Sequence, residues 1–234
     1  MQLDIHFIWT ALQVIVQAIP MTLLIAITPL FVGLIIGLIV TFIRQGNNRI
    51  LKIIVNFYVS FYRGTPVIMH IFIIYFGFPL FFETYFDIAL HTVPIVVFVI
   101  IALSLNASAF LAEIIRSGVM SVDNGQIEAA YSLGMTTFDV YRRIIFPQAF
   151  VTVIPNLTNI IVAFLHSSSI AFLVSVQEMT GAANIIASSN LKYLEAFIAV
   201  GLVYWILSIL IEFSANKMES KLTKHLKRGV VQRG

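Results

Sequence analysis

The chain has 234 residues, of which 59% are hydrophobic and 11% charged, and its mean hydropathy is +0.97. This composition excludes a water-soluble globular protein, because the few polar residues could not cover the apolar surface. The sequence has no cysteine, which excludes disulfides and thiol chemistry. The formal charge of +3 comes from basic residues that flank apolar stretches instead of forming a folded patch, which argues against a nucleic-acid partner.

Five apolar stretches predict an all-α polytopic membrane protein, since about 20 helical residues cross a bilayer. We expect a single transmembrane domain over residues 1–234, with spans at about 20–43, 60–82, 93–115, 152–176 and 195–213. Before them, residues 5–18 are expected to lie along the outer interface, anchored by Trp9 and separated from the first span by Pro20. Gly33 and Gly37 give the first span a small-residue surface, which either receives another helix or faces lipid.

The second span carries the sequence Arg63-Gly64-Thr65-Pro66 near its inner boundary. Two interpretations of Arg63 stay open: its side chain reaches the lipid headgroups, or it faces the helix bundle close to a transport route. Thr65 and Pro66 are expected to kink the helix and free a backbone carbonyl, which is tolerated only where protein or water covers it.

Polar side chains also occur inside the third and fourth spans. Asn106 is expected to hydrogen-bond to another helix rather than to bind a ligand, and Glu113 is expected to pair with Arg116, three residues later. The fourth span has His166, Ser167 and Ser168 at its centre. This group is costly in hydrocarbon, so it should face the bundle or an aqueous cavity; hydrogen bonding between helices is the alternative to substrate contact. Residues 177–194 are too polar to span and are expected outside.

Residues 120–150 form a charged loop in which local signals predict two short helices. Asp123 and Gln126 have the spacing of a capping box, and Gly134 suits the left-handed position that ends many helices. Thr136 or Thr137 can cap the second helix, with Asp139 in its first turn. Pro147 is expected to break or kink that helix.

This loop resembles the EAA loop of the membrane subunits of ABC importers. The spacing of that motif is filled by Glu128, Ala129, Ala130, Gly134, Ile144 and Pro147, while Phe146 stands where the family usually has leucine. Residues 63–66, RGTP, and 110–116, FLAEIIR, resemble the permease subunits for polar amino acids of the histidine, glutamine, arginine and cystine type. The resemblance covers about residues 15–220 and implies the type I ABC importer fold. In the fourth span, His166 and Ser167 replace a lysine and an acid or amide of the family pattern.

The distribution of basic residues predicts an N-terminus outside and a C-terminus in the cytoplasm, because inner loops are enriched in Lys and Arg. Of the 14 basic residues, only Arg63 then lies in a span and only Lys192 lies outside. The other twelve lie on the inner side: Arg44, Arg49, Lys52, Arg116, Arg142, Arg143, Lys217, Lys221, Lys224, Lys227, Arg228 and Arg233. This orientation places the loop 120–150 in the cytoplasm, where ATP is.

The sequence has no phosphate-binding loop, no metal-ligand cluster and no nucleophile with a base. We therefore expect a chain that is no enzyme and holds no cofactor or metal, with ATP bound by a partner. The resemblance implies a multi-pass permease in the cell membrane and an ATPase dimer that grips the loop. It assigns the coupling to Glu128, Ala129, Ala130, Gly134 and Pro147.

The resemblance also implies an extracytoplasmic solute-binding protein, a second permease subunit that is identical or similar, and a polar amino acid as substrate. The candidates for the translocation path are Arg63, Thr65, Asn106, His166, Ser167 and Ser168. The alternative is a proton-coupled secondary transporter or channel in which Arg63, Glu113 and His166 relay protons. That alternative predicts inverted repeats and carboxylates near mid-membrane, and the sequence offers neither.

Overall fold

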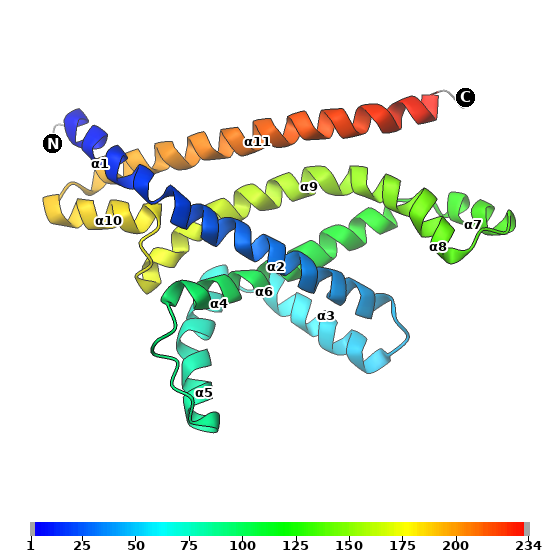
Figure 1. Cartoon of the computed structure of the whole chain (residues 1–234), viewed down its shortest axis with the longest axis horizontal. Coiled ribbons are helices and arrows are strands. Elements are labelled where there is room, and N and C mark those ends of the chain that lie inside the picture. The colour runs from blue at the N-terminus through cyan, green and yellow to red at the C-terminus, as the bar shows by residue number, and fades with distance from the viewer. Residues whose placement is uncertain (1–2, 232–234) are drawn as a thin grey trace.

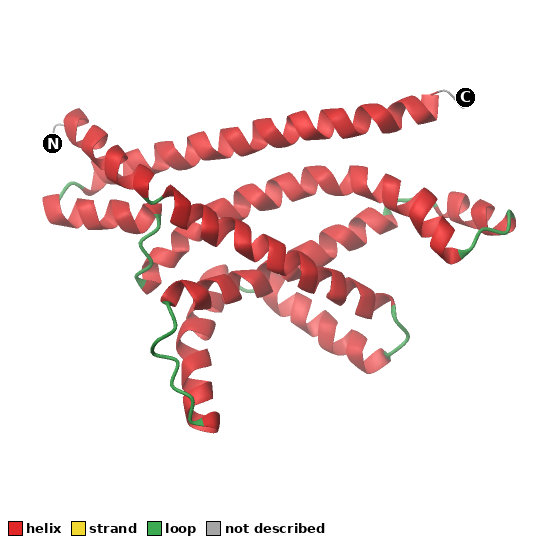
Figure 2. Cartoon of the chain, in the orientation of Figure 1, coloured by secondary structure: helices red, strands yellow, loops and turns green. Residues whose placement is uncertain are grey.

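The computed structural model describes residues 3–231, and this part of the chain is helical with short connecting loops and no strand (Figure 2). The elements in chain order are α1 (Ile5–Gln17), α2 (Ile19–Gln45), α3 (Arg49–Gly64), α4 (Val67–Phe72), η1 (Ile73–Gly77), α5 (Phe78–Phe86), α6 (Ile95–Met120), α7 (Asn124–Ser132), α8 (Thr137–Val140), η2 (Tyr141–Ile145), α9 (Phe146–Ser167), η3 (Ser168–Val174), α10 (Met179–Asn190) and α11 (Tyr193–Val231). The basic side chains after Lys217, namely Lys221, Lys224, Lys227, Arg228 and Arg233, lie outside the described residues.

Within residues 3–231, five helical stretches are long and apolar enough to cross a membrane, which confirms the predicted all-α fold with five spans. They are Ile19–Gln45, Val67–Phe86, Ile95–Met120, Thr137–Val174 and Tyr193–Lys217. The start of α1 and the end of α11 lie at opposite ends of the long axis (Figure 1). We call the end that holds α7 and α8 the α7 end, and the end that holds α1 and α10 the α10 end.

The second predicted span differs from the structure, in which two separate helices flank the sequence Arg63-Gly64-Thr65-Pro66. Helix α3 ends at Gly64, and α4 begins at Val67, because Pro66 cannot donate a backbone hydrogen bond and holds the residue before it extended. The expectation of a kink within one continuous helix is therefore wrong. Both α3 and α4 pack on α6, whereas α5 turns away from the long axis of the bundle (Figure 1).

The fourth predicted span is part of a longer helical run that begins in the loop 120–150. Helices α8, η2 and α9 follow one another without a break and continue into η3. The break predicted at Pro147 does not occur, and the helix widens instead to the π form over Tyr141–Ile145, just before the proline. A π turn fits this position, because it accommodates a residue whose ring crowds the carbonyl four residues earlier.

The bundle is built on the seam between α2 and α6, the most extensive contact between any two of the described helices. A Cβ atom on Gly33 would lie 2.6 Å from Ala107 Cβ and 3.0 Å from the Ser108 backbone nitrogen. A Cβ atom on Gly37 would likewise lie 3.0 Å from the Ser108 carbonyl oxygen. The small surface of the first span therefore receives a helix of the same chain, which settles the alternative left open by the sequence.

A second packed cluster lies at the α10 end, where α1 and α10 cover the first part of α11. Helix α1 buries Phe7, Ala11 and Ile15 there, while Trp9 remains 64% exposed on its other face. The N-terminal helix is thus half covered by protein and is not held by the interface alone. The segment 177–194 forms α10 and does not span, as predicted.

Candidate functional site

Helices α7 and α8 and the link between them form a compact projection, residues 123–140, which we call the knob (Figure 1). Asp123 caps α7, because its Oδ1 accepts a hydrogen bond from the Gln126 backbone nitrogen at 3.3 Å. The reciprocal half of the predicted capping box is absent from the described contacts, since Gln126 Oε1 accepts instead from Gln148 Nε2 at 2.6 Å. Thr136 caps α8 through the Asp139 backbone nitrogen, as one of the two predicted candidates.

Gly134 ends the first helix of the knob in the left-handed conformation, with φ of 78°. Two backbone hydrogen bonds close the turn, from Gly134 N to Tyr131 O at 2.9 Å and from Met135 N to Ala130 O at 3.1 Å. Residues with a Cβ atom pay a steric cost at this φ. The left-handed turn predicted at Gly134 is therefore confirmed, and its role in coupling stays a prediction.

The knob has its own small core and an exposed apolar surface. Its core is formed by Ala130 and Val140 together with two residues just outside the knob, Val122 and Ile145. Ala130 is therefore only 3% exposed and packs inside the knob, and its assignment to the coupling stays a prediction. Exposed residues surround this core: Glu128, Ala129, Leu133 at 84% exposure and Phe138 at 71%.

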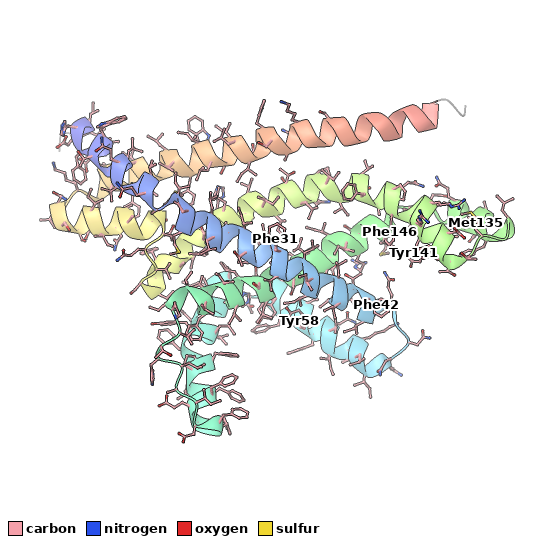
Figure 3. All side chains as sticks on the ribbon, viewed as in Figure 1. Phe31, Phe42, Tyr58, Met135, Tyr141 and Phe146 are labelled. Atoms are coloured by element: carbon pink, nitrogen blue, oxygen red, sulfur yellow. The ribbon has the colours of Figure 1, made fainter. Side chains whose placement is uncertain are left out.

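The knob is joined directly to both of the helices that carry the mid-span polar residues. On one side, two residues, 121 and 122, connect it to α6; on the other, α8 continues through η2 into α9. Pro147 is half-buried at the start of α9, next to the π turn. Figure 3 shows Met135, Tyr141 and Phe146 gathered at this α7 end. A displacement of the knob would therefore act on α6 and α9 together.

A cavity of about 180 Å³ lies between α3, α4, α6 and α9 and brings several predicted path residues together. It is lined by Tyr62, Thr65, Val67, Asn106, Phe110, Ile160, Ala163, Phe164 and Ser167. Three of the six predicted path residues line it, namely Thr65, Asn106 and Ser167. Its polar groups are hydroxyls and an amide, so it offers hydrogen bonds on an aromatic and aliphatic wall.

No sequence pattern indicated His70, a buried residue of α4 that lies within hydrogen-bond distance of two residues lining this cavity. Its Nε2 lies 2.6 Å from Thr65 Oγ1, and its Nδ1 lies 3.2 Å from Asn106 Nδ2. Asn106 Nδ2 also donates to the Tyr62 carbonyl oxygen at 3.1 Å, so Asn106 does link helices, as predicted. Thr65 Oγ1 also donates to the Phe61 carbonyl oxygen at 2.6 Å. This hydrogen bond satisfies the backbone carbonyl oxygen of Phe61, near the C-terminal end of α3.

The other predicted path residues lie outside the cavity. His166 points to α11, where its Nε2 lies 2.9 Å from Ser208 Oγ, so it makes the helix–helix contact that was the alternative to substrate binding. Ser168 is fully buried and donates to the Leu165 carbonyl oxygen at 2.6 Å. The Arg63 guanidinium lies beside the cavity, 5.8 Å from the centre of the Phe110 ring.

Glu113 is the centre of a cluster of cationic side chains near the α7 end. The predicted pair with Arg116 is present, with Arg116 Nη2 2.8 Å from Glu113 Oε2. Arg44 Nη1 donates to the other carboxylate oxygen, and Arg63 Nη1 lies 3.7 Å from Oε2. Arg63 thus contacts α6 while its side chain remains 46% exposed, and its place close to a transport route stays a prediction.

The proton relay of the alternative function is not assembled in this structure. Arg63 and Glu113 meet between α3 and α6, whereas His166 contacts α11. No hydrogen bond or ion pair among the described residues joins His166 to either of them. Nor do the described His, Asp and Glu residues form a group of three that could hold a metal ion.

The chain matches one protein family over most of its length. Residues 30–224 match the family described as binding-protein-dependent transport system inner membrane component. A probable amino-acid permease protein, YxeN of Bacillus subtilis (strain 168), is 39% identical over 95% of this chain and 97% of its own length. The L-cystine transport system permease protein TcyL of the same organism is 34% identical over 96% of this chain and 94% of its own.

Solved structures agree with the sequence relatives. A structure described as an amino acid ABC transporter with histidines has a TM-score of 0.84 and 28% identity, and the match covers 94% of this chain and 100% of the other. An inward-facing conformation of the MetNI methionine ABC transporter has a TM-score of 0.72 at 19% identity, covering 94% and 99% of the two chains. The second match bears on the fold alone.

Proposed function

Because the chain belongs to the binding-protein-dependent transport system inner membrane components and is an ABC importer permease of the amino-acid class, we propose that it carries a polar amino acid inward by alternating access. As a multi-pass membrane subunit of a transport system it is not itself catalytic. We assign ATP hydrolysis to a separate ATPase dimer that binds the knob.

The observation that carries this proposal is the continuity between the knob and the cavity. Helix α6 ends next to the knob, and α9 continues from it through η2. Together these two helices supply four residues to the cavity wall: Asn106, Phe110, Phe164 and Ser167. Closure of the ATPase dimer would move the knob, and the two helices would transmit that movement to the cavity. Such a rigid-body movement of helices around a fixed site is how transporters alternate access.

Charge supports an orientation with the α7 end in the cytoplasm. The described basic residues Arg44, Arg49, Lys52, Arg116, Arg142 and Arg143 lie on the helix ends and turns of this end. Lys192 is at the other end, next to α10. Inner loops of membrane proteins carry such an excess of Lys and Arg. The knob then faces the compartment that contains ATP.

We assign the cavity of about 180 Å³ to the passage of the substrate. Its hydroxyls and amide suit the polar groups of an amino acid, and Arg63 at its edge offers a cation to a carboxylate. Two further partners follow from the family: a second permease subunit, identical or similar, which completes the route, and an extracytoplasmic solute-binding protein that delivers the amino acid at the α10 end.

Replacing Gly134 by Asp tests the coupling role of the knob. The side chain would strain the left-handed turn and change the angle of the two helices, so uptake of the amino acid that depends on the binding protein should be lost while the permease still inserts. The control is Gly46→Asp, at an exposed glycine in the α2–α3 turn with an ordinary φ of −64°. Normal uptake by Gly134→Asp, at wild-type amounts of protein in the membrane, would refute the proposal.

Orientation can be tested separately, because the sequence has no cysteine and a single introduced thiol is unique. Ser132→Cys on the exposed face of α7 should react with a membrane-impermeant maleimide only in inverted vesicles. His91→Cys, in the loop between α5 and α6, should react in intact cells. The opposite pattern would place the knob outside and exclude an intracellular ATPase as its partner.

A further inference from the structure

The cluster around Glu113 contains more cations than its single carboxylate can neutralise. Arg44, Arg63 and Arg116 all contact Glu113. Lys52 lines the same cavity as Arg44 and Arg116, on the first turn of α3. Glu113 is the only carboxylate among the residues that line this cavity and its neighbour. The described part of the chain thus leaves a local excess of positive charge at the α7 end.

These cations border open space. One cavity of about 400 Å³ is lined by Arg44, Lys52, Asn56, Glu113 and Arg116. A neighbouring cavity of about 380 Å³ shares three of these residues and adds Val59, Ser60, Arg63 and Gly64. The Arg44 side chain is only 17% exposed, and its Nε atom is buried with no hydrogen-bond partner among the described residues. Buried donors are normally satisfied, so the described residues leave the Arg44 guanidinium incompletely paired.

An apolar surface adjoins the charged cavity on the outer face of α3. Lys52, Asn56 and Arg63 recur on one side of this helix, and Val55 and Val59 are buried against the bundle. The remaining face is apolar and exposed: Ile50, Leu51, Ile53, Ile54 and Phe57. Phe42, 78% exposed, stands at the same end on α2 (Figure 3). A charged pocket next to an exposed apolar face matches a molecule with an anionic head and hydrocarbon tails.

We propose that the cavity between α2, α3 and α6 binds the phosphate of an anionic phospholipid headgroup, with the acyl chains along the exposed face of α3. Arg44, Lys52 and Arg116 would hold the phosphate oxygens, and the Asn56 amide can donate a further bond. Basic pockets between membrane helices on the cytoplasmic side recognise anionic headgroups in this manner. The inference takes its choice of leaflet from the orientation proposed above; the binding itself does not depend on transport.

The substrate is a poorer occupant of this cavity. A zwitterionic amino acid brings an ammonium group, and the single carboxylate available to it is already contacted by three guanidinium groups. An amino acid also has no long apolar part to cover Ile53, Ile54 and Phe57, which are 60%, 58% and 73% exposed. The phospholipid accounts for both the charge and the apolar face.

Lipid-dependent thermal stability of the assembled importer in detergent tests this inference. Phosphatidylglycerol, phosphatidylcholine and inorganic phosphate are titrated separately, and the unfolding of the permease is followed. Phosphatidylglycerol should raise Tm in a saturable way, and the other two probes should not. Lys52→Gln should weaken the apparent affinity for phosphatidylglycerol about fivefold, the value of one cation near an anionic surface.

Arg49→Gln is the matched control, because Arg49 is an exposed basic residue of the same turn that lines neither cavity. It should leave the phosphatidylglycerol titration unchanged. An equal loss in both variants, or none in Lys52→Gln, would overturn the site. An equal response to inorganic phosphate would overturn the lipid as its source. Because the assay measures binding, these results are independent of whether Gly134→Asp abolishes uptake.

Discussion

Glu113 and Glu178 lie at opposite ends of the molecule, and their surroundings satisfy the carboxylate in opposite ways. Glu113, near the α7 end, is 16% exposed and is surrounded by three guanidinium groups. Glu178, at the start of α10, is fully buried and accepts from neutral donors, the Gly181 backbone nitrogen and the Tyr204 hydroxyl, each at 2.8 Å. One carboxylate is held by charge and the other by hydrogen bonds.

The difference follows from where each carboxylate lies. At the α7 end, helices α2, α3 and α6 bring cations from three different turns to one place, where an anion is needed to hold them together. At the α10 end, Glu178 caps a helix beneath α1 and α11, where burial raises its pKa above the ordinary value of 4.5. Largely buried charge is thus concentrated at the end with the knob, whereas the opposite end is closed by apolar packing and hydrogen bonds, with the ion pair of Asp4 and Lys192 at its surface.

Glu113→Gln is expected to have the largest effect, because it removes the only carboxylate from among three guanidinium groups. Breaking a largely buried ion pair by removing one partner costs about 3 kcal/mol at the lower end of the usual range, and the residual exposure of Glu113 places it there. Thermal unfolding of the purified protein in detergent measures this loss. A loss of stability no larger than that of Glu178→Gln would show that the two carboxylates contribute equally to stability.

Gly33→Ala is expected to have the next largest effect on stability, because it disturbs the close packing of α2 on α6. These two helices also carry Arg44 and Glu113. The new methyl group would lie 2.6 Å from Ala107 Cβ, and overpacking of this kind costs about 2 kcal/mol. Gly201→Ala is the matched control, since nothing lies within 4 Å of its Cβ and alanine favours a helix. The same Tm measurement compares the two, and equal values would argue against close helix contact at Gly33.

Glu178→Gln is expected to change stability by less than about 1 kcal/mol, because the amide occupies the same space and can keep one of the two bonds.

The pH dependence of stability gives a second measure of how Glu178 differs from Glu113. Since the folded pKa is raised, the stability that Glu178 contributes is fully present below the unfolded value of 4.5 and is lost as pH rises through the folded pKa. Tm of the wild type should therefore fall relative to Glu178→Gln as pH rises. The exposed Glu83→Gln serves as the control, and a constant difference would contradict the raised pKa.

Asp4→Asn is expected to have the smallest effect, although it removes an ion pair of 2.6 Å with Lys192. Both side chains are well exposed, 40% and 38%, and exposed pairs contribute little to stability. No measurable change in Tm is expected at physiological salt. A loss as large as that of Gly33→Ala would mean that the packing of α1 at the α10 end depends on charge.

Local chemistry allowed the knob to be predicted from sequence. The cap at Asp123, the cap at Thr136 and the left-handed turn at Gly134 depend on residues within four positions of one another. The pair of Glu113 and Arg116 was predictable for the same reason, because residues three apart share a helix face. Five spans followed from hydropathy, which depends on composition alone.

Contacts between distant residues carried no such signal. Arg44 is 69 positions from Glu113, and nothing in either neighbourhood indicates that they meet. His70 was missed because a single histidine in an apolar stretch gives no pattern, and His166 was assigned to the path although it contacts α11. Ala130 looks like Ala129 in the sequence, but only the packing of α8 onto α7 shows which of the two is buried.

The π turn over Tyr141–Ile145 fixes the rotational phase of the helix that follows it. A π turn holds one residue more than an α turn, and each residue rotates a helix by about 100°. Because the extra residue is absorbed within the turn, deleting one residue there would let it close as an ordinary α turn and would leave Ser167 and Phe164 in phase with the cavity wall. The same deletion a few residues later, in the regular part of α9, would rotate both side chains off that wall by about 100°.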